Sequence, residues 1–544
     1  MELSRLPRST ALGALALTMV LTGLAPAGAT SGATTTPADS SQRAAGSLRM
    51  AVDAVGGASA LRGLKTFRYH AASQRSILDE GAAPGSGASP AATVESRVRY
   101  RLKGSRPPRV RIDNVRTSLG VDRPVREVLS GQRGYISGVD ANFSQPVTKA
   151  MTSDRWAALH QEQELLNPHV LLSRALDNPG LASNGGQRTI DGRRYRVLVL
   201  RDDVAPIRLF VDVRKERIAM LQTTQHDYLR RDVPIAVTYG SWQLAGDGLR
   251  FPHRVTLTSD GLEMVRERRT DVVANARIKD RVFRFPTSVP AATFDPDLAD
   301  IGARTSEWLL SFVALGFIKD GGQRAINPIT ITDGTTTAAG VRLLGGVANN
   351  SLVVQRPGGV VVFEGALHDH RAEAVIQYIE DSPDFTGPIT HVVTTHHHSD
   401  HAGGMRPYVA LGATTVVGEQ AVPFFQQVFA DRGSTVLPDR LDGTTVAANV
   451  QGVPAAGLSL PNGIQVFPLQ TTHSVDMVVP YVADQGILFT SDIYSPPGLP
   501  SPSDPNAQAI AAMVTARGLT PKWIAGGHGT FISYAAFKAA LGIS

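Results

Sequence analysis

Four imidazoles and one carboxylate fall within six residues of the segment Thr395-His396-His397-His398-Ser399-Asp400-His401-Ala402-Gly403-Gly404. The segment contains the spacing His-x-His-x-Asp-His and follows an apolar run that is typical of a buried strand. Residues two apart in an extended chain point the same way, so His396 and His398 can face one metal ion. Asp400 and His401 come after the turn and can face a second metal. The alternative is a solvated, His-rich loop without a metal.

Three downstream segments carry further ligand-type residues beside small or hydroxyl residues, each close to the end of a short apolar run. They are Gln470-Thr471-Thr472-His473-Ser474, residues 486–492 and residues 524–529. Loops at strand ends, positioned by a rigid sheet, commonly carry the chemistry of a protein. The sequence predicts a first metal site of His396, His398 and His473 and a second of Asp400, His401 and His528. Asp492 is predicted to bridge both metals.

Each downstream ligand has a plainer interpretation when it is taken alone. A single histidine after a strand is more often a hydrogen-bonded structural residue, and a single aspartate there is usually a turn former. The metal interpretation depends on the ordered set behind the first motif. His397, between two predicted ligands, is expected to point away from the first metal and to support the loop.

These four segments resemble those of the metallo-β-lactamase fold superfamily of hydrolases, and the resemblance covers residues 326–544. It implies a four-layer αβ/βα sandwich with the metals at one edge of its two sheets. The chain has no cysteine, and Asp492 stands where a bridging ligand is expected. Both features are more similar to the glyoxalase II, lactonase and phosphodiesterase branches than to the true β-lactamases. One departure is Glu364-Gly365 where many relatives have Asp-x-Gly; Glu364 is expected to support the metal loop by hydrogen bonds.

The donor set predicts the cofactor and the reaction class. Imidazole and carboxylate ligands suit zinc, so two Zn²⁺ per chain are expected. Metal binding lowers the pKa of water from about 15.7 to about 7, which provides a bridging hydroxide at neutral pH. Asp400 can accept its proton, and Tyr494 can donate a hydrogen bond to a developing oxyanion. A structural aromatic residue is the equal alternative for Tyr494.

The sequence therefore predicts a zinc-dependent hydrolase of a small molecule that carries an ester, thioester, lactone, amide or phosphodiester bond. Two alternatives stay open. One is a mononuclear iron sulfur dioxygenase, because one branch of the superfamily uses the same motif with a single iron. The other is a non-catalytic envelope binding protein with a structural metal site.

The N-terminus is predicted to direct export. Residues 1–29 combine a basic start, a short apolar core and an Ala27-Gly28-Ala29 cleavage site, as a signal peptide does. Residues 30–46 are rich in Thr, Ser, Ala and Gly and are expected to form a flexible tether. A secreted, periplasmic or cell-envelope location follows. The net charge of +6 favours peripheral contact with anionic envelope surfaces. Nucleic acid is not expected as a partner, and the oligomeric state cannot be read from the sequence.

Residues 47–296 are predicted to form a second domain, followed by a linker over residues 297–325 that contains a helix at residues 305–317. Successive strand-like runs with little intervening helix indicate a strongly curved antiparallel sheet, which gives a mixed α+β chain. A helical stretch over residues 155–175 is expected to be kinked or split at Pro168. Residues 82–92 look like a surface insertion. The region weakly resembles the half-barrel fold of lipoprotein carriers, which implies a role in binding an acyl chain or another apolar group; a scaffold is the alternative.

Overall fold

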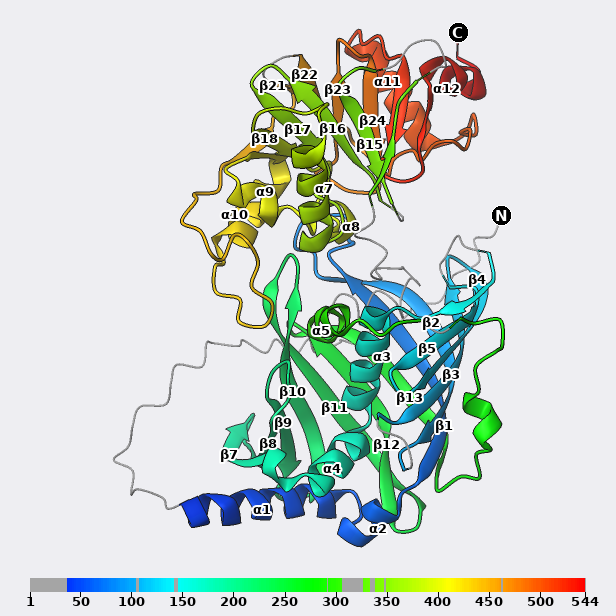
Figure 1. Cartoon of the computed structure of the whole chain (residues 1–544), viewed down its shortest axis with the longest axis vertical. Helices are drawn as coiled ribbons and strands as arrows, with labels where there is room; N and C mark the ends of the chain where they lie inside the picture. The colour runs from blue at the N-terminus through cyan, green and yellow to red at the C-terminus, as the bar shows by residue number, and fades with distance from the viewer. Residues whose placement is uncertain are drawn as a thin grey trace, which may run out of the picture.

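A computed structural model describes residues 37–103, 107–140, 145–290, 292–305, 326–332, 338–346, 349–460 and 463–543. The predicted signal peptide and nearly all of the predicted linker helix lie outside these residues. An N-terminal domain built on one sheet lies beside a C-terminal domain built on two (Figure 1). Within the described part of the chain, no helix combines the length and apolar character needed to cross a membrane.

The N-terminal domain is one antiparallel sheet of thirteen strands in the order β6-β5-β4-β3-β2-β1-β13-β12-β11-β10-β9-β8-β7. Nearly every strand pairs with its neighbour in the chain. The pairing of β1 with β13 joins the two halves of the sheet, and β6 and β7 form its edges. The strands are β1 Thr66–Leu78, β2 Ala88–Arg101, β3 Arg109–Ser118, β4 Val121–Ser130, β5 Arg133–Gly138, β6 Val147–Ala150, β7 Ala182–Ile190, β8 Arg193–Leu200, β9 Ile207–Asp212, β10 Arg217–Asp227, β11 Arg231–Gly246, β12 Leu249–Ser259 and β13 Leu262–Ala274.

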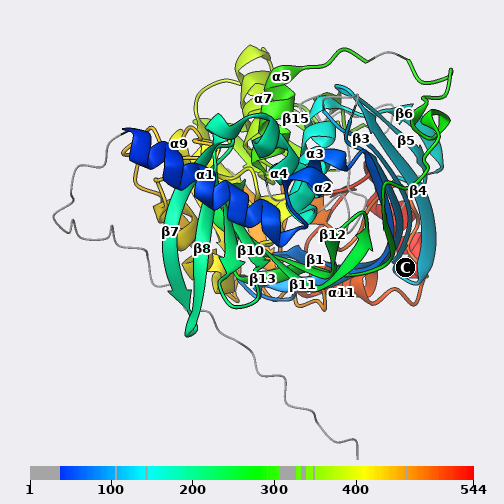
Figure 2. The same cartoon turned by 90° about the horizontal axis from the view of Figure 1, so that it is seen from below.

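Alternation of side chains along these strands explains which face of the sheet is covered. In β1, Phe67, Tyr69 and Ala71 are buried, whereas Ala72 on the opposite face is exposed, as a period of two requires. The sheet curves around helices on its buried face, and Figure 2 shows this curvature from below. The predicted curved antiparallel sheet is therefore present.

Helices fill the concave side. They are α1 Pro37–Ala54, α2 Ala58–Gly63, α3 Ser153–Leu166, α4 Pro168–Asp177 and α5 Pro296–Arg304, with the short 3-10 turn η1 Pro179–Leu181. A second 3-10 turn, η2 Asp280–Phe283, packs on the opposite face of the sheet against Val128 and Tyr135. Pro168 separates α3 from α4, as predicted, because proline is tolerated in the first turn of a helix but not in its interior. Leu165 and Leu171 pack with Phe67 and Phe251 in the main core.

Helix α1 overturns part of the predicted tether over residues 30–46. The helix begins at Pro37, within that stretch. Leu48, Ala51 and Val52 of the same helix are buried in the main core. Tertiary packing of these side chains stabilises the helix, which the polar composition of its first turns did not indicate.

The C-terminal domain is a four-layer sandwich. Its first sheet has the order β14-β15-β16-β17-β18-β19-β20 and its second β21-β22-β23-β24-β25-β26. The first comprises β14 Asn327–Ile329, β15 Val341–Gly345, β16 Ser351–Arg356, β17 Gly359–Phe363, β18 Ile389–Val393, β19 Thr414–Gly418 and β20 Val450–Val453; the second comprises β21 Leu458–Leu460, β22 Ile464–Pro468, β23 Val478–Val482, β24 Ile487–Ser491, β25 Trp523–Gly526 and β26 Phe531–Ser533.

Three apolar clusters define the layers. Phe363 of the first sheet and Phe489 of the second meet in the core between the sheets. The outer face of the first sheet packs on α7 Asp369–Asp381, α9 Arg406–Ala410 and α10 Val422–Ala430, which follows the turn η4 Glu419–Ala421. The outer face of the second sheet packs on α11 Pro505–Ala516 and α12 Tyr534–Leu541. The predicted αβ/βα architecture is confirmed.

A buried ionic network joins the two domains. Arg231, the first residue of β11, is 1% exposed, and its Nη1 lies 3.0 Å from Oδ2 of Asp439. It also pairs with Asp442, and Arg406 of the C-terminal domain pairs with both carboxylates. The neighbouring Asp232 accepts hydrogen bonds from Ser434 and Thr435. Shared carboxylates therefore fix the N-terminal domain against the loop that follows α10.

Candidate metal centre

Loops at the ends of four strands bring the predicted ligands together. His396 and His398 follow β18, His473 follows β22, Asp492 follows β24 and His528 follows β25. The short helix α8 (Ser399–Ala402) then carries Asp400 and His401 in its first turn. The helix lies close to the preceding loop, because a Cβ atom at Gly403 would stand 2.1 Å from the carbonyl oxygen of Leu367. That close approach explains the glycine after the motif.

The first set consists of His396, His398, His473 and Asp492, each with one ligand atom within 4.8 Å of the others. Nε2 of His473 lies 3.1 Å from Nε2 of His396 and 3.3 Å from Oδ2 of Asp492. The ring centroid of His398 lies 4.4 Å from that of His396 and 4.5 Å from that of His473. Three imidazoles thus face one point beside one carboxylate oxygen.

The second set consists of Asp400, His401, Asp492 and His528, within the same limit. Oδ1 of Asp492 lies 2.8 Å from Nε2 of His401 and 3.0 Å from Nε2 of His528. Oδ2 of Asp400 lies 3.4 Å and 3.5 Å from the same two nitrogens. Asp492 therefore presents one oxygen to each set, which is the arrangement of a bridging carboxylate.

The ligand atoms themselves fit a cation. Nε2 of His401 and Oδ1 of Asp492 are buried, and neither makes a hydrogen bond despite their close approach. A buried polar atom without a partner is costly, by about 1–3 kcal/mol. A cation shared between the two atoms removes that cost. With imidazole nitrogens and carboxylate oxygens as donors and no thiolate in the chain, the set suits zinc.

The two sets differ in their electrostatics. Burial, followed by the neighbouring imidazoles of His401 and His398, holds the pKa of His396 well below its ordinary value. Burial likewise lowers the pKa of His398 to about 4. Burial acts in the same direction on His528, but the nearby carboxylates of Asp400 and Asp492 outweigh it and raise its pKa to about 10. His396 and His398 of the first set therefore offer neutral imidazoles, whereas His528 of the second set holds a proton that a dication would displace.

Glu364 supports the metal loop as expected. It is fully buried at the end of β17, and its Oε1 accepts hydrogen bonds from Oγ1 of Thr395 (2.6 Å) and Oγ of Ser491 (3.0 Å). The same oxygen lies 3.5 Å from Nδ1 of His401. Carboxylates in this position orient ligands and raise their basicity. His397 also has the supporting geometry expected of it, since its Nδ1 lies 2.8 Å from Oδ1 of Asp476.

Two asparagines that the sequence interpretation missed complete the supporting shell. Nδ2 of Asn349 donates to Oδ2 of Asp400 (3.1 Å) and to its backbone carbonyl (3.0 Å). Nδ2 of Asn350 donates to the carbonyls of Gly526 (2.9 Å) and Gly529 (3.1 Å), which flank His528. The Asn-Asn pair between two strands was a recognisable turn signal, but its role depends on contacts across the fold.

The structure places Tyr494 differently from the oxyanion donor considered for it. Its hydroxyl donates to the carbonyl of Gly498, and its ring packs against Phe537 at 5.0 Å between centroids. The side chain lies in the core beneath α11 and α12. Tyr494 is therefore a packing residue, which was the alternative.

The N-terminal domain reaches the metal centre, which no sequence feature indicated. The carbonyl oxygen of Gly81 lies 3.0 Å from Nε2 of His398, and Ser399 donates to Oε1 of Glu80 at 2.9 Å. Both residues belong to the turn between β1 and β2, which rises to α8 in Figure 1. Part of the predicted surface insertion over residues 82–92 is this turn, and the rest begins β2.

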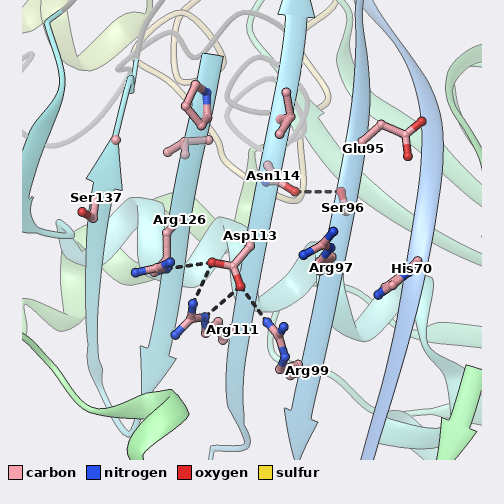
Figure 3. Close-up of a pocket in the computed structure, with 14 residues that line it drawn as sticks. His70, Glu95, Ser96, Arg97, Arg99, Arg111, Asp113, Asn114, Arg126 and Ser137 are labelled. Carbon is pink, nitrogen blue, oxygen red and sulfur yellow. Dashed lines mark hydrogen bonds and ion pairs between the residues drawn. The ribbon is translucent and has the colours of Figure 1, made fainter. Parts of the chain in front are cut away.

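A separate hollow of about 690 Å³ lies on the other face of the N-terminal sheet and carries no predicted ligand (Figure 3). Asp113 occupies its centre and pairs with Arg99, Arg111 and Arg126. Burial opposes ionisation of Asp113, but these hydrogen bonds outweigh it and lower its pKa to about 2. Charged side chains therefore line this hollow, which lies on the face of the sheet opposite to the helices of the main core.

Comparison with known proteins gives a family match over part of the chain. A family model described as the metallo-beta-lactamase superfamily matches residues 344–528. Metallo-β-lactamase FIM-1 from Pseudomonas aeruginosa, in its mono-zinc form, is 20% identical, with 40% of this chain and 94% of that one covered and a TM-score of 0.30. The enzymes from Hirschia baltica and Pontibacter korlensis are each 19% identical, with 40% of this chain and 96% and 98% of theirs covered and TM-scores of 0.30. No curated protein matches. The matched residues include every member of both metal sets.

Proposed function

We propose that this chain, whose C-terminal domain belongs to the metallo-β-lactamase superfamily, is a hydrolase that holds two zinc ions and cleaves a small-molecule substrate. The observation that carries the proposal is Asp492, which presents Oδ2 to one histidine set and Oδ1 to the other. Zinc, when bound, supplies an activated water and polarises the bond to be cleaved. Ester, thioester, lactone, amide and phosphodiester bonds are the candidates.

The protein's own contribution is to place and orient groups. His396, His398 and His473 would hold the first ion, and Asp400, His401 and His528 the second. Asn349 donates to Oδ2 of Asp400 and so fixes the direction of that carboxylate. A carboxylate that is oriented in this way can accept the proton of the attacking water, a role that contributes about 10²–10⁴-fold to a rate.

The proposal includes export and a small-molecule partner. The basic and apolar pattern of residues 1–29 supports cleavage after Ala29 and delivery to the cell envelope or the exterior. Mass spectrometry of the mature N-terminus in the producing cell tests this directly. A mature chain that retains residues 1–29 contradicts export and leaves the metal centre unaffected.

Metal content and one variant test the catalytic proposal. Elemental mass spectrometry of the purified protein is expected to give about two zinc ions per chain, and a panel of hydrolytic substrates is expected to reveal turnover. Asp400→Asn is expected to lower turnover at least about 10²-fold while most bound zinc remains. One iron per chain, with oxidation of a sulfur compound, would instead establish the dioxygenase alternative. A protein that cannot be loaded with metal would contradict both the hydrolase proposal and the dioxygenase alternative.

A further inference from the structure

The turn between β1 and β2, residues 79–87, is here called the hairpin tip, and it lies against the metal centre. It contacts the centre on two sides. Gly81 and Glu80 contact His398 and Ser399, and the carbonyl of Ala82 accepts a hydrogen bond of 2.8 Å from the backbone of Val475, two residues after His473. The hairpin tip therefore touches the loops of two predicted ligands of the first set.

The hairpin tip is held firmly within its own domain. Asp79 is 1% exposed, and its two carboxylate oxygens accept hydrogen bonds of 2.8 Å from Arg230 in the turn between β10 and β11. A Cβ atom at Gly81 would stand 2.1 Å from Oγ of Ser86, so the tip is closely packed across its width. Its position is therefore set by the N-terminal sheet and not by the metal loops alone.

Hydrogen-bond chemistry identifies which nitrogen of His398 faces the centre. A carbonyl oxygen can only accept, so the contact of Gly81 with Nε2 places the ring proton on that nitrogen. The lone pair of the neutral ring is then on Nδ1. A histidine that ligates a metal usually donates its other ring N–H to a carbonyl or a carboxylate. Gly81 supplies that acceptor from a different domain.

The carboxylate of Glu80 completes the arrangement. Its Oε1 is held by the hydroxyl of Ser399, and its Oε2 lies 3.4 Å from Nδ1 of His398. An ionised carboxylate has no proton to donate to a nitrogen lone pair. Oε2 of Glu80 and the lone pair on Nδ1 of His398 therefore face each other with no proton between them, and a cation bound by both atoms would remove the repulsion. Glu80, His398 and Asp400 in fact each offer a ligand atom within 4.8 Å of the others.

We propose that Glu80 is a metal-facing carboxylate supplied by the N-terminal domain, and that Gly81 orients His398 as a ligand through Nδ1. The metal centre is then assembled across the two domains, and the N-terminal domain sets the affinity of the first site. This inference rests on the proposed function, since it requires a cation at His398.

The test measures zinc affinity by competition with a chromophoric chelator in the full chain. Glu80→Gln removes the negative charge and keeps the shape, and it is expected to weaken the first site by about 10–100-fold. Glu80→Asp retains the charge on a shorter side chain, and its zinc affinity is expected to lie between those of Glu80→Gln and wild type. The control is Glu95→Gln, an exposed carboxylate on β2 that lines the hollow in Figure 3. It is expected to leave zinc affinity unchanged.

A spectroscopic measurement keeps the proposal testable apart from activity. Replacement of zinc by Co²⁺ gives visible absorption bands that depend on the ligand set, and Glu80→Gln is expected to change them while Glu95→Gln does not. Circular dichroism establishes that each variant is folded. If wild type binds two zinc ions and Glu80→Gln binds them equally well, the inference fails and the proposed function stands. If wild type binds no metal, both fail.

Discussion

Nδ1 of His396 lies 3.0 Å from Oγ1 of Thr395, and this contact decides which nitrogen of His396 faces the metal centre. The Thr395 hydroxyl lies 2.6 Å from the carboxylate of Glu364, which can only accept. The Thr395 hydroxyl therefore donates its hydrogen bond to Glu364 and accepts a hydrogen bond from Nδ1–H of His396. The lone pair of His396 is left on Nε2, which faces Nε2 of His473 at 3.1 Å.

Thr395→Val tests this hydrogen-bond relay from His396 through Thr395 to Glu364. The valine has nearly the same shape but cannot accept from His396, so the ring loses the partner that fixes its tautomer. We expect zinc affinity at the first site to fall by about 10–100-fold, measured by chelator competition. Thr415→Val is the matched control, because Thr415 is also fully buried and its hydroxyl makes no hydrogen bond. Equal losses in both variants would point to packing and not to the relay.

Asp492→Asn tests the bridge. The amide keeps the shape of the carboxylate, but it removes the charge and leaves a nitrogen to face one histidine set. We expect the metal content to fall from about two to one or fewer ions per chain by elemental analysis. Asp484→Asn serves as the control, since Asp484 is 55% exposed and pairs with Arg356 away from the ligands. Retention of two ions in Asp492→Asn would contradict a bridging role.

Tyr494→Phe is expected to leave turnover within about twofold of wild type, because the hydroxyl donates to Gly498 and the ring lies in the core. A loss of turnover of about 10²-fold, the size seen when an oxyanion donor is removed, would instead support Tyr494 as a hydrogen-bond donor to the oxyanion. Initial rates on whichever substrate the hydrolytic panel identifies decide the matter.

His169 makes the stability of the N-terminal domain depend on pH. Burial lowers its pKa to about 3, with its ring stacked on Phe251 at 3.7 Å between centroids. Between pH 3 and the ordinary histidine pKa of about 6.5, the unfolded chain binds a proton at His169 and the folded chain does not. Stability is therefore complete above pH 6.5 and falls on acidification, by about 1.4 kcal/mol per pH unit from this group until pH 3.

Urea unfolding of metal-free protein at pH 7.5 and pH 5 measures this effect. His169→Gln is expected to reduce the loss of stability between the two pH values, since glutamine does not titrate. His70→Gln, at a position 42% exposed, is the control and is expected to behave as wild type does. An unchanged pH dependence in His169→Gln would show that other groups cause it.

Arg231→Met tests the ionic network between the domains. The substitution leaves Asp439 and Asp442 buried with one fewer cation, and breaking such a buried pair typically costs about 3–5 kcal/mol. The free energy of unfolding from urea titration is the measurement. Arg266→Met, which removes a 61% exposed arginine paired with Glu263, is expected to change it by less than about 1 kcal/mol. Similar small effects for both would mean that the network is not stabilising.

The sequence by itself predicted the donor set, and its resemblance to the metallo-β-lactamase superfamily implied the architecture of the C-terminal domain. Ligand identity and order are local properties, and apolar runs that end in His or Asp predict strand ends at one edge of a sheet. The curved antiparallel sheet and the break at Pro168 followed from strand runs and from proline stereochemistry in the same way. The helix at Pro37–Ala54 was missed because it forms on a surface that other strands and helices provide.

Only the tertiary structure decided how the centre is completed. Gly81 lies 317 positions before His398, and nothing near Glu80 in the chain marks it as metal-facing. Tyr494 was likewise ambiguous, because its direction depends on whether Gly498 and Phe537 or the ligands lie beside its ring. Which atom of an imidazole faces a metal is set by the partner of its other nitrogen. That partner comes from a distant segment, so no local pattern can encode it.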